Sequence, residues 1–414
     1  MLVEDGLGRR LQLIQGIQWL HGANGDPYAT LLRGFDDDVD AIHQQVRARG
    51  PLWRSTTGTW VTADHRLGAE VLSHPGLGPR CRDGLPVPQP RQVMPLTEAF
   101  LGIDREEAGR LRDLWGPAFR GKAADRHQPR TEQVCERVLD GVDGQFDVIT
   151  DVVQQVPVEV LADLFALSEP QRTRLRDDCA DAAIALDSLL CPQRLAATRR
   201  MLDAVDDLRA LFGDLAGGPA VESGDSVLDT VWPTGGDPAP DDVRALGVLL
   251  AVVGVHMTAN LVASAVAALL AAPELWSATG GDSDRAALAV DETLRHGAPV
   301  QMQAAVAHTD LELAGQQVEA GHQVVVLIGA ANRDPGAFTD PGRFDLDRAT
   351  GPKPRPLLPG PPHEVVLPFA VNQAGILLRV LATRFPRLRQ SGPLLRRYRA
   401  PVTQSLLRFP VSSN

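Results

Sequence analysis

Apolar residues recur at every third or fourth position along most of this chain, a spacing that predicts amphipathic helices. The clearest such segments are residues 106–119, 131–139, 158–165, 192–212 and 285–295. The alternation typical of strands is confined to residues 52–62, 311–318 and 323–327. Stretches rich in Gly, Pro or Asp, which favour loops, are residues 217–242 and 351–362. The pattern therefore predicts a mainly α protein with small β-sheets.

One apolar segment, residues 246–272, has no charged side chain and is long enough to cross a bilayer. His256, Thr258, Asn260 and Ser264 lie along it, however, and polar groups at that depth are costly in lipid. A helix that is apolar on most sides also occurs in the middle of a large soluble protein. We therefore expect a buried core helix and no contact with a membrane.

Composition narrows the possible partners and compartment. The 414 residues carry a formal net charge of −11, which disfavours binding to nucleic acid or to an anionic membrane surface. The four cysteines, Cys81, Cys135, Cys179 and Cys191, lack the C-x-x-C spacing of metal sites. The first residues show no apolar secretion signal, and unpaired thiols favour a reducing compartment. These features predict a cytoplasmic protein.

The most specific motif lies in the C-terminal third. Glu292 and Arg295 are three residues apart on a predicted helix, and the stretch ANRDPGAFTDPGRFDLDR follows at residues 331–348. Together these motifs resemble the cytochrome P-450 family, in which the helix pair and a later arginine form a buried triad. The resemblance assigns the third position to Arg343. Two arginines around one carboxylate would have a structural role, since removing one leaves a buried charge uncompensated.

The resemblance covers the chain beyond residue 38. Residues 146–167 match the family's segment ahead of its middle helices, and Arg110 and Arg112 match its early helix. The uncharged helix from residue 246 corresponds to the long central helix that crosses the haem face. The resemblance implies one large domain with the cytochrome P-450 fold over residues 39–414, preceded by an N-terminal arm at residues 1–38.

The haem ligand of that family is absent from the matching interval. The family holds haem through a cysteine thiolate in a Gly-rich loop before the last long helix, and this thiolate favours O–O cleavage. Residues 351–388 contain no cysteine here, and Cys191 is the last in the chain. Counting back without gaps from residues 384–386, the ligand position falls on Glu364, next to His363.

Other positions that serve haem in the family are also altered. Ala108 stands where the early helix has a propionate-binding His, and Ala305 where a strand has a propionate-binding Arg. In the central helix, His256 and Met257 replace the acid and the alcohol that deliver protons to oxygen. We therefore expect no haem, no other cofactor and no metal, and we do not expect an enzyme.

Two enzymatic alternatives remain open at this stage. His363 or His256 could ligate a haem in place of the cysteine, which would keep a monooxygenase with an unconventional ligand. Alternatively, His363 and Glu364 could be a general acid/base pair for an NDP-4-keto-hexose 3,4-isomerase. A lone His on an apolar helix is more often a packed or hydrogen-bonded core residue, and we interpret His256 in that way.

A haem-free group within the family offers a third hypothesis. Residues 16–38 and 186–195 are similar to the P-450-like auxiliary proteins of antibiotic pathways. That resemblance implies a protein partner, a deoxysugar glycosyltransferase that glycosylates a macrolide or an anthracycline. Aromatic and apolar anchors suit such an interface, although the arm could equally pack on its own core. The candidate partner-binding residues are Trp19, Tyr28, Leu31 and Leu32.

Overall fold

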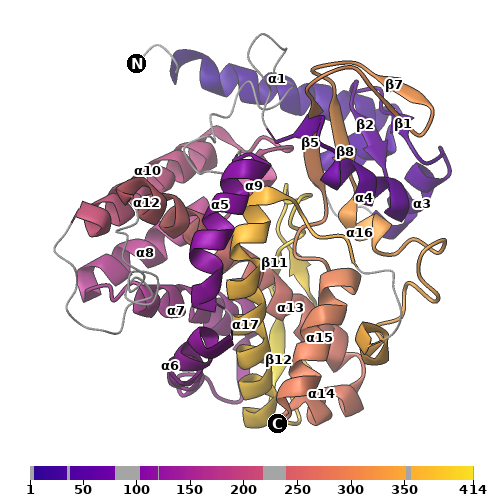
Figure 1. Cartoon of the computed structure of the whole chain (residues 1–414). Helices are drawn as coiled ribbons and strands as arrows, with labels where there is room; N and C mark the ends of the chain where they lie inside the picture. The colour runs from indigo at the N-terminus through magenta and orange to yellow at the C-terminus, as the bar shows by residue number, and fades with distance from the viewer. Residues whose placement is uncertain are drawn as a thin grey trace.

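The computed structural model describes residues 4–34, 38–79, 103–119, 121–217, 239–350 and 356–413. Residues 218–238 of the first predicted loop, residues 351–355 of the second, and Cys81 lie outside these residues. Figure 1 shows the longest helices gathered around α17 and α13, with the largest sheet at one side and α1 along the top. The predicted architecture, mainly α with small sheets, is confirmed.

The helices account for most of the described chain. They are α1 Glu4–Ala23, α2 Pro27–Arg33, α3 Val39–Arg47, α4 His65–Ser73, α5 Arg105–Trp115, α6 Gly121–Leu139, α7 Val156–Leu164, α8 Glu169–Ala182, α9 Ala185–Ser188, α10 Leu195–Gly217, α12 Pro240–Leu249, α13 Val255–Leu270, α14 Pro273–Thr279, α15 Ser283–His296, α16 Ile328–Ala331 and α17 Pro361–Arg384. Short 3₁₀ or π-helical stretches are Gly116–Phe119, Val148–Val153, Leu250–Gly254 and Leu346–Thr350.

The strands are short and form four sheets. They are β1 Trp53–Arg54, β2 Trp60–Thr62, β3 Leu77–Gly78, β4 Gln145–Asp147, β5 Gln303–Ala307, β6 Leu311–Leu313, β7 Gln316–Val318, β8 Gln323–Val326, β9 Arg389–Gln390, β10 Leu395–Arg396, β11 Leu406–Arg408 and β12 Pro410–Ser412. The largest sheet has the order β1-β2-β8-β5-β3. Its parallel pair joins β2 to β8, more than 250 residues apart in sequence, so the N-terminal and C-terminal thirds share one sheet.

The central helix is continuous from α12 through the π-helical stretch Leu250–Gly254 to α13. It is apolar and long enough to cross a membrane, but 94% of its most apolar window is buried inside the protein. The expectation of a core helix at residues 246–272 is therefore confirmed. In the described part of the chain, α17 is the other helix with sufficient length and apolarity, and 67% of its window is buried.

The N-terminal arm packs on the same core as the rest of the chain. Leu7, Leu11 and Ile14 on one face of α1 join the main apolar cluster. Gln15 donates hydrogen bonds to the carbonyls of Pro192 and Gln193, which precede α10. The arm is thus fastened to the segment before α10 by apolar burial and by amide hydrogen bonds.

The buried ion pair predicted on the E-x-x-R helix is present. Arg295 Nη2 lies 2.6 Å from Glu292 Oε1, and both side chains are 2% exposed. The guanidinium also donates to the carbonyls of Asn332 and Pro341 at 3.0 and 2.8 Å. Arg295 therefore connects α15 to the segment between α16 and residue 345. Each hydrogen bond that its guanidinium donates offsets part of the cost of burying the positive charge.

The third member of this cluster is Arg348, which corrects the prediction of Arg343. Arg348 Nε lies 3.4 Å from Glu292 Oε1 and is largely buried. Arg343 is exposed, and only its backbone carbonyl takes part, accepting from Arg295 Nη2 at 2.9 Å. Arg343 closes a turn with Asp340, which leaves its side chain toward solvent, whereas the 3₁₀ turn at residue 346 brings Arg348 back to Glu292.

The substitutions Arg348→Gln and Arg343→Gln separate the two assignments. We expect Arg348→Gln to lower the free energy of unfolding by about 1–3 kcal/mol, because Glu292 loses a charged neighbour in a dry interior. Arg343→Gln should change it by less than about 0.5 kcal/mol, as for other exposed positions. Urea unfolding followed by circular dichroism measures both values. A larger loss for Arg343→Gln than for Arg348→Gln would restore the original assignment.

Candidate functional site

The position of the family's haem ligand lies in a helix here and not in a loop. α17 begins at Pro361, so Glu364 occupies its first turn, where a carboxylate is favoured by the helix dipole. Arg112 of α5 donates from Nη1 to Glu364 Oε2 at 3.1 Å. The arginine that the family resemblance places near haem is thus paired with the residue at the ligand position.

His363 does not form an acid/base pair with Glu364. Its side chain is 3% exposed, and neither ring nitrogen forms a hydrogen bond with any residue that the structure describes. Burial lowers the pKa of the His363 imidazole to about 4, so the ring is neutral at physiological pH. A neutral and enclosed ring cannot reach a sugar in solution, which removes the geometric support for the isomerase hypothesis.

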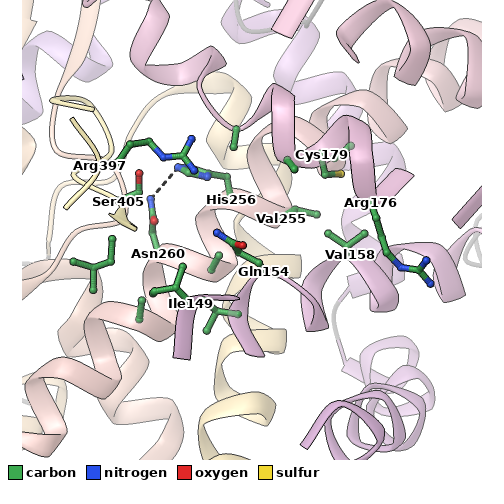
Figure 2. Close-up of a pocket in the computed structure, with 17 residues that line it drawn as sticks. Ile149, Gln154, Val158, Arg176, Cys179, Val255, His256, Asn260, Arg397 and Ser405 are labelled. Carbon is green, nitrogen blue, oxygen red and sulfur yellow. Dashed lines mark hydrogen bonds between the residues drawn. The ribbon is translucent and has the colours of Figure 1, made fainter. Parts of the chain in front are cut away.

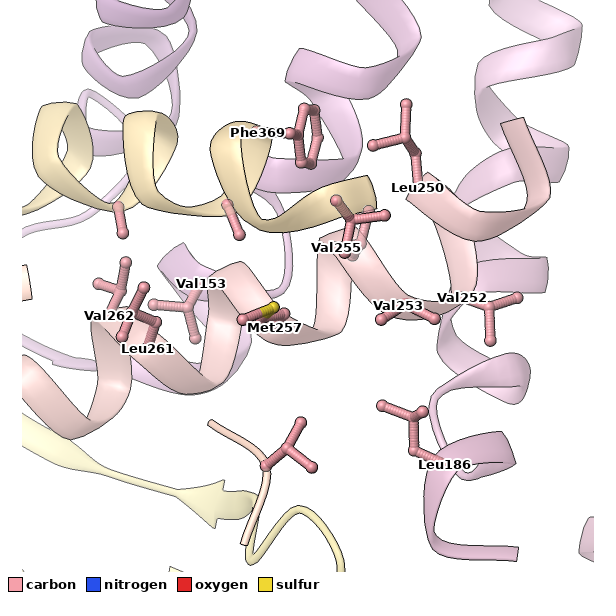
Figure 3. Packing of buried hydrophobic residues seen from close by; sticks show 14 of the residues in the cluster. Val153, Leu186, Leu250, Val252, Val253, Val255, Met257, Leu261, Val262 and Phe369 are labelled. Atoms are coloured by element: carbon pink, nitrogen blue, oxygen red, sulfur yellow. The ribbon is translucent and has the colours of Figure 1, made fainter. Parts of the chain in front are cut away.

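The central helix and α17 are in direct contact where they cross. A Cβ added to Gly254 would lie 3.2 Å from the ring of Phe369, which is 1% exposed. Figure 3 shows Phe369 on α17 beside Leu250 and Val255 of the central helix. Met257, at the position of the family's proton-delivering alcohol, is fully buried in the same apolar cluster. Gly254 and Phe369 are therefore in contact where the two helices cross, with no planar group between them.

The residues at the positions that bind the haem propionates in the family do not suit a propionate here. Ala108 is buried in α5, and Ala305 lies in β5 beside a cavity of about 1050 Å³. That cavity is also lined by Asp104, Arg105 and Glu106, but Arg105 donates to the backbone carbonyls of Leu72 and Ser73. Two carboxylates without a free arginine would repel a propionate. Arg110, which matches the family's early helix, is paired with Glu107 and Asp242.

The residues present therefore do not fit a haem-thiolate group. Cys135, Cys179 and Cys191 are buried thiols, and burial raises the pKa of Cys135 and of Cys191 to about 12. Such thiols stay protonated and do not ligate metals at neutral pH. Within the described ranges, no three His, Cys, Asp or Glu side chains form a group that could hold a metal ion.

His256 is a hydrogen-bonded core residue, as predicted. It is 9% exposed, and its Nε2 lies 3.2 Å from Asn260 Nδ2 one turn later. Burial, and to a smaller extent the positive charge of Arg397, lower the pKa of the imidazole to about 3. His256 is therefore neutral, and it lies against a cavity that is described below.

Three of the four candidate partner-binding residues are core residues, which corrects the prediction. Tyr28, Leu31 and Leu32 of α2 are 1%, 6% and 4% exposed. Asp26 caps this helix by accepting from the amide of Ala29, and it orients the helix so that these side chains face the interior. Trp19 alone is exposed, at 54%, with the Arg33 guanidinium 5.3 Å from its ring.

A more continuous apolar surface, which was not predicted, lies on the same arm. Leu13, Ile17 and Leu20 are 62%, 43% and 59% exposed, and their spacing of four and three residues places them on one face of α1. α1 thus has two apolar faces, one buried and one open. The signal was present in the sequence, because apolar residues occur at positions 7, 11 and 14 and again at 13, 17 and 20.

The helical architecture and the triad-like cluster define a cytochrome P450 fold. The crystal structure of ligand-free CYP164A2 from Mycobacterium smegmatis matches it with a TM-score of 0.77 at 28% identity, covering 93% of this chain and 99% of that chain. The family described as cytochrome P450 matches residues 287–369. That range contains Glu292, Arg295 and Glu364.

Relatives match the chain over nearly its whole length. "Protein AknT" of Streptomyces galilaeus is 39% identical over 99% of this chain and 96% of the relative. "Cytochrome P450 family protein EryCII" of Saccharopolyspora erythraea is 30% identical, with 98% of each chain covered. The chain belongs to the cytochrome P450 family, and the predicted resemblance to P-450-like proteins of antibiotic pathways is confirmed.

The substitution His363→Leu tests whether the buried imidazole of His363 makes the stability of the protein depend on pH. Because the folded-state pKa of about 4 lies below the ordinary value of 6.5, the unfolded chain binds a proton that the folded chain does not. The contribution of His363 to the free energy of unfolding should therefore fall by about 1.4 kcal/mol per pH unit as the pH drops from 6.5 toward 4. His363→Leu should remove that part of the slope and retain or increase stability at pH 7. Urea midpoints across this pH range measure the effect, and an unchanged slope would contradict it.

Haem binding can be tested with and without a thiol at the ligand position. Mixing the purified protein with hemin should give no saturable Soret change and no carbon monoxide complex. Glu364→Cys should behave in the same way, because Phe369 still contacts Gly254 and position 305 still lacks an arginine. A stoichiometric haem complex in either protein would show that the two helices can separate to admit the group.

Proposed function

We propose that this protein is a non-catalytic auxiliary protein that binds and activates a deoxysugar glycosyltransferase. The transferase would attach a nucleotide-activated deoxysugar to a macrolide or anthracycline-type aglycone, as the family resemblance implies. The observation that carries the proposal is the pair of Arg112 with Glu364, because it places an ion pair where the family needs a free thiolate and a free arginine. The protein acts in the cytoplasm and without haem.

The exposed face of α1, formed by Leu13, Ile17 and Leu20, is the surface proposed to bind the transferase. Burying one large apolar side chain contributes about 1.5–3 kcal/mol, so three on one face can anchor an interface. The opposite face of α1 is fixed by Leu11 and by Gln18, which donates to the carbonyl of Leu190 at 2.7 Å. A helix held in this way is ordered before binding, and the complex is spared the entropic cost of ordering it.

Activation on this proposal is a linkage effect. A protein that binds one conformation of the transferase more tightly than the others raises the population of that conformation. It also stabilises the transferase against unfolding to an extent that depends on concentration and affinity. No group of the auxiliary protein needs to touch the sugar or the aglycone, which agrees with the enclosed state of His363 and the ion-paired state of Glu364.

Co-expression with a deoxysugar glycosyltransferase encoded beside this gene tests the proposal. We expect the two proteins to co-purify and sugar transfer to increase. The double variant Leu13→Glu, Leu20→Glu should abolish both effects. It should leave the melting temperature of the auxiliary protein unchanged. Leu407→Glu is a matched control, since Leu407 is 49% exposed and lies on β11, not on α1. The control should behave as wild type.

Three outcomes would contradict this proposal. Wild-type protein that neither co-purifies with the transferase nor increases transfer would defeat it as a whole. Loss of self-association in the double variant, with unchanged activation, would assign the α1 face to a second copy of this chain. Accumulation of isomerised sugar when the pure protein is incubated with an NDP-4-keto-hexose alone would establish an enzyme instead.

A further inference from the structure

A cavity of about 220 Å³ lies against the central helix, beside the π-helical stretch Val148–Val153, α8 and the C-terminal β10–β11 hairpin. Figure 2 shows Arg397, Ser405, His256 and Asn260 together at one end of it, with Arg176 at the other. The cavity thus has a polar end built from the hairpin and from the central helix.

The polar end contains the guanidinium group of Arg397. Its Nε is buried and has no hydrogen-bond acceptor among the residues that the structure describes. The buried carboxylate of Asp187 interacts electrostatically with Arg397, but its hydrogen bonds come from the amides of Val402 and Thr403 and from the Thr403 hydroxyl. A buried donor on a charged group is costly unless an acceptor meets it, so this end of the cavity favours an anion.

His256 and Asn260 extend the donor set. Asn260 Nδ2 donates to His256 Nε2 when the neutral imidazole carries its proton on Nδ1, which fits the hydrogen bond between these two residues. In that tautomer Nδ1–H is left to donate. Ser405 also lines the cavity, but its hydroxyl donates to Thr403 Oγ1, because the Thr403 hydroxyl itself donates to Asp187. The end of the cavity therefore offers a guanidinium group and an imidazole N–H.

The remaining wall is mostly apolar. It is formed by Ile149, Val153, Val158, Val255 and Leu406, with small side chains of Ala259 and Ala263 between them. Gln154 and Arg176 are exposed and mark an opening to solvent. Arg176 does not compete for an anion, because it is paired with Glu159 and Glu169.

We propose that this cavity binds a small organic carboxylate with an apolar body, whose carboxylate group meets Arg397 and His256. A planar carboxylate matches the guanidinium fork by two parallel hydrogen bonds, and the apolar walls bury the rest of the molecule. A cation is disfavoured by Arg397, and a neutral molecule would leave that charge unpaired. The volume admits a single-ring compound and excludes a macrolide. This inference does not rest on the proposed function.

Isothermal titration calorimetry with benzoate tests the site on the intact protein. Benzoate has the required carboxylate and a flat apolar body, benzamide is its uncharged isostere, and inorganic phosphate is an anion without an apolar body. We expect saturable binding of one benzoate, at least tenfold weaker binding of benzamide, and weak binding of phosphate. Equal affinities for benzoate and benzamide, or no saturable binding of benzoate, would overturn the proposal.

Two variants locate the binding. Arg397→Gln should weaken benzoate binding about tenfold or more, as expected for loss of a charge-assisted contact. Arg396→Gln is the matched control, since Arg396 is exposed, does not line this cavity and should leave the affinity unchanged. Ala259→Leu fills the cavity without touching the charge and should also abolish binding. If Arg397→Gln does not fold, as judged by circular dichroism, Ala259→Leu decides, and full affinity in that variant would place benzoate elsewhere.

Discussion

The buried ion pair of Glu292 and Arg295 is the interaction on which the fold of this protein depends. Burying two charges is costly, and the cost is offset here because Arg295 also donates to three backbone carbonyls beyond α16 and Asp345 donates its amide to Glu292. The pair therefore joins α15 to a long irregular segment that has little regular structure of its own. Removing either partner would leave the other charge buried and unpaired.

The same fold accommodates different side chains at the positions that the family uses to hold haem. A haem contributes a large apolar surface to a protein core, and a chain without it has to fill that volume with side chains. Phe369 against Gly254 and the fully buried Met257 supply such contacts between α17 and the central helix. The ion pair between Arg112 and Glu364 is partly exposed, so it contributes little energy, but it leaves neither group free for other chemistry. The residues that hold this fold together are thus different from the residues at the positions that the family uses for haem chemistry.

On the proposed function, activity depends on the side chains that the protein exposes to a partner. α1 has one apolar face that anchors it and a second that remains open, and exposed apolar faces of this kind are typical of interaction sites. The cavity beside His256 is independent of that surface, because its donors come from the central helix and the C-terminal hairpin. A small ligand there would be bound by residues far in sequence from α1, so the two proposed sites would be built from different parts of one core.

The sequence alone determined the fold class, the family and the absence of a cysteine in the C-terminal third, because these depend on periodicity and on short motifs. It also identified Glu292 and Arg295, which are neighbours on one helix. It could not choose Arg348 over Arg343, since which arginine reaches Glu292 depends on the path of an irregular turn. It misplaced Tyr28, Leu31 and Leu32 for the same reason: a short apolar helix looks alike whether it faces the core or a partner, and only the packing of α2 buries it.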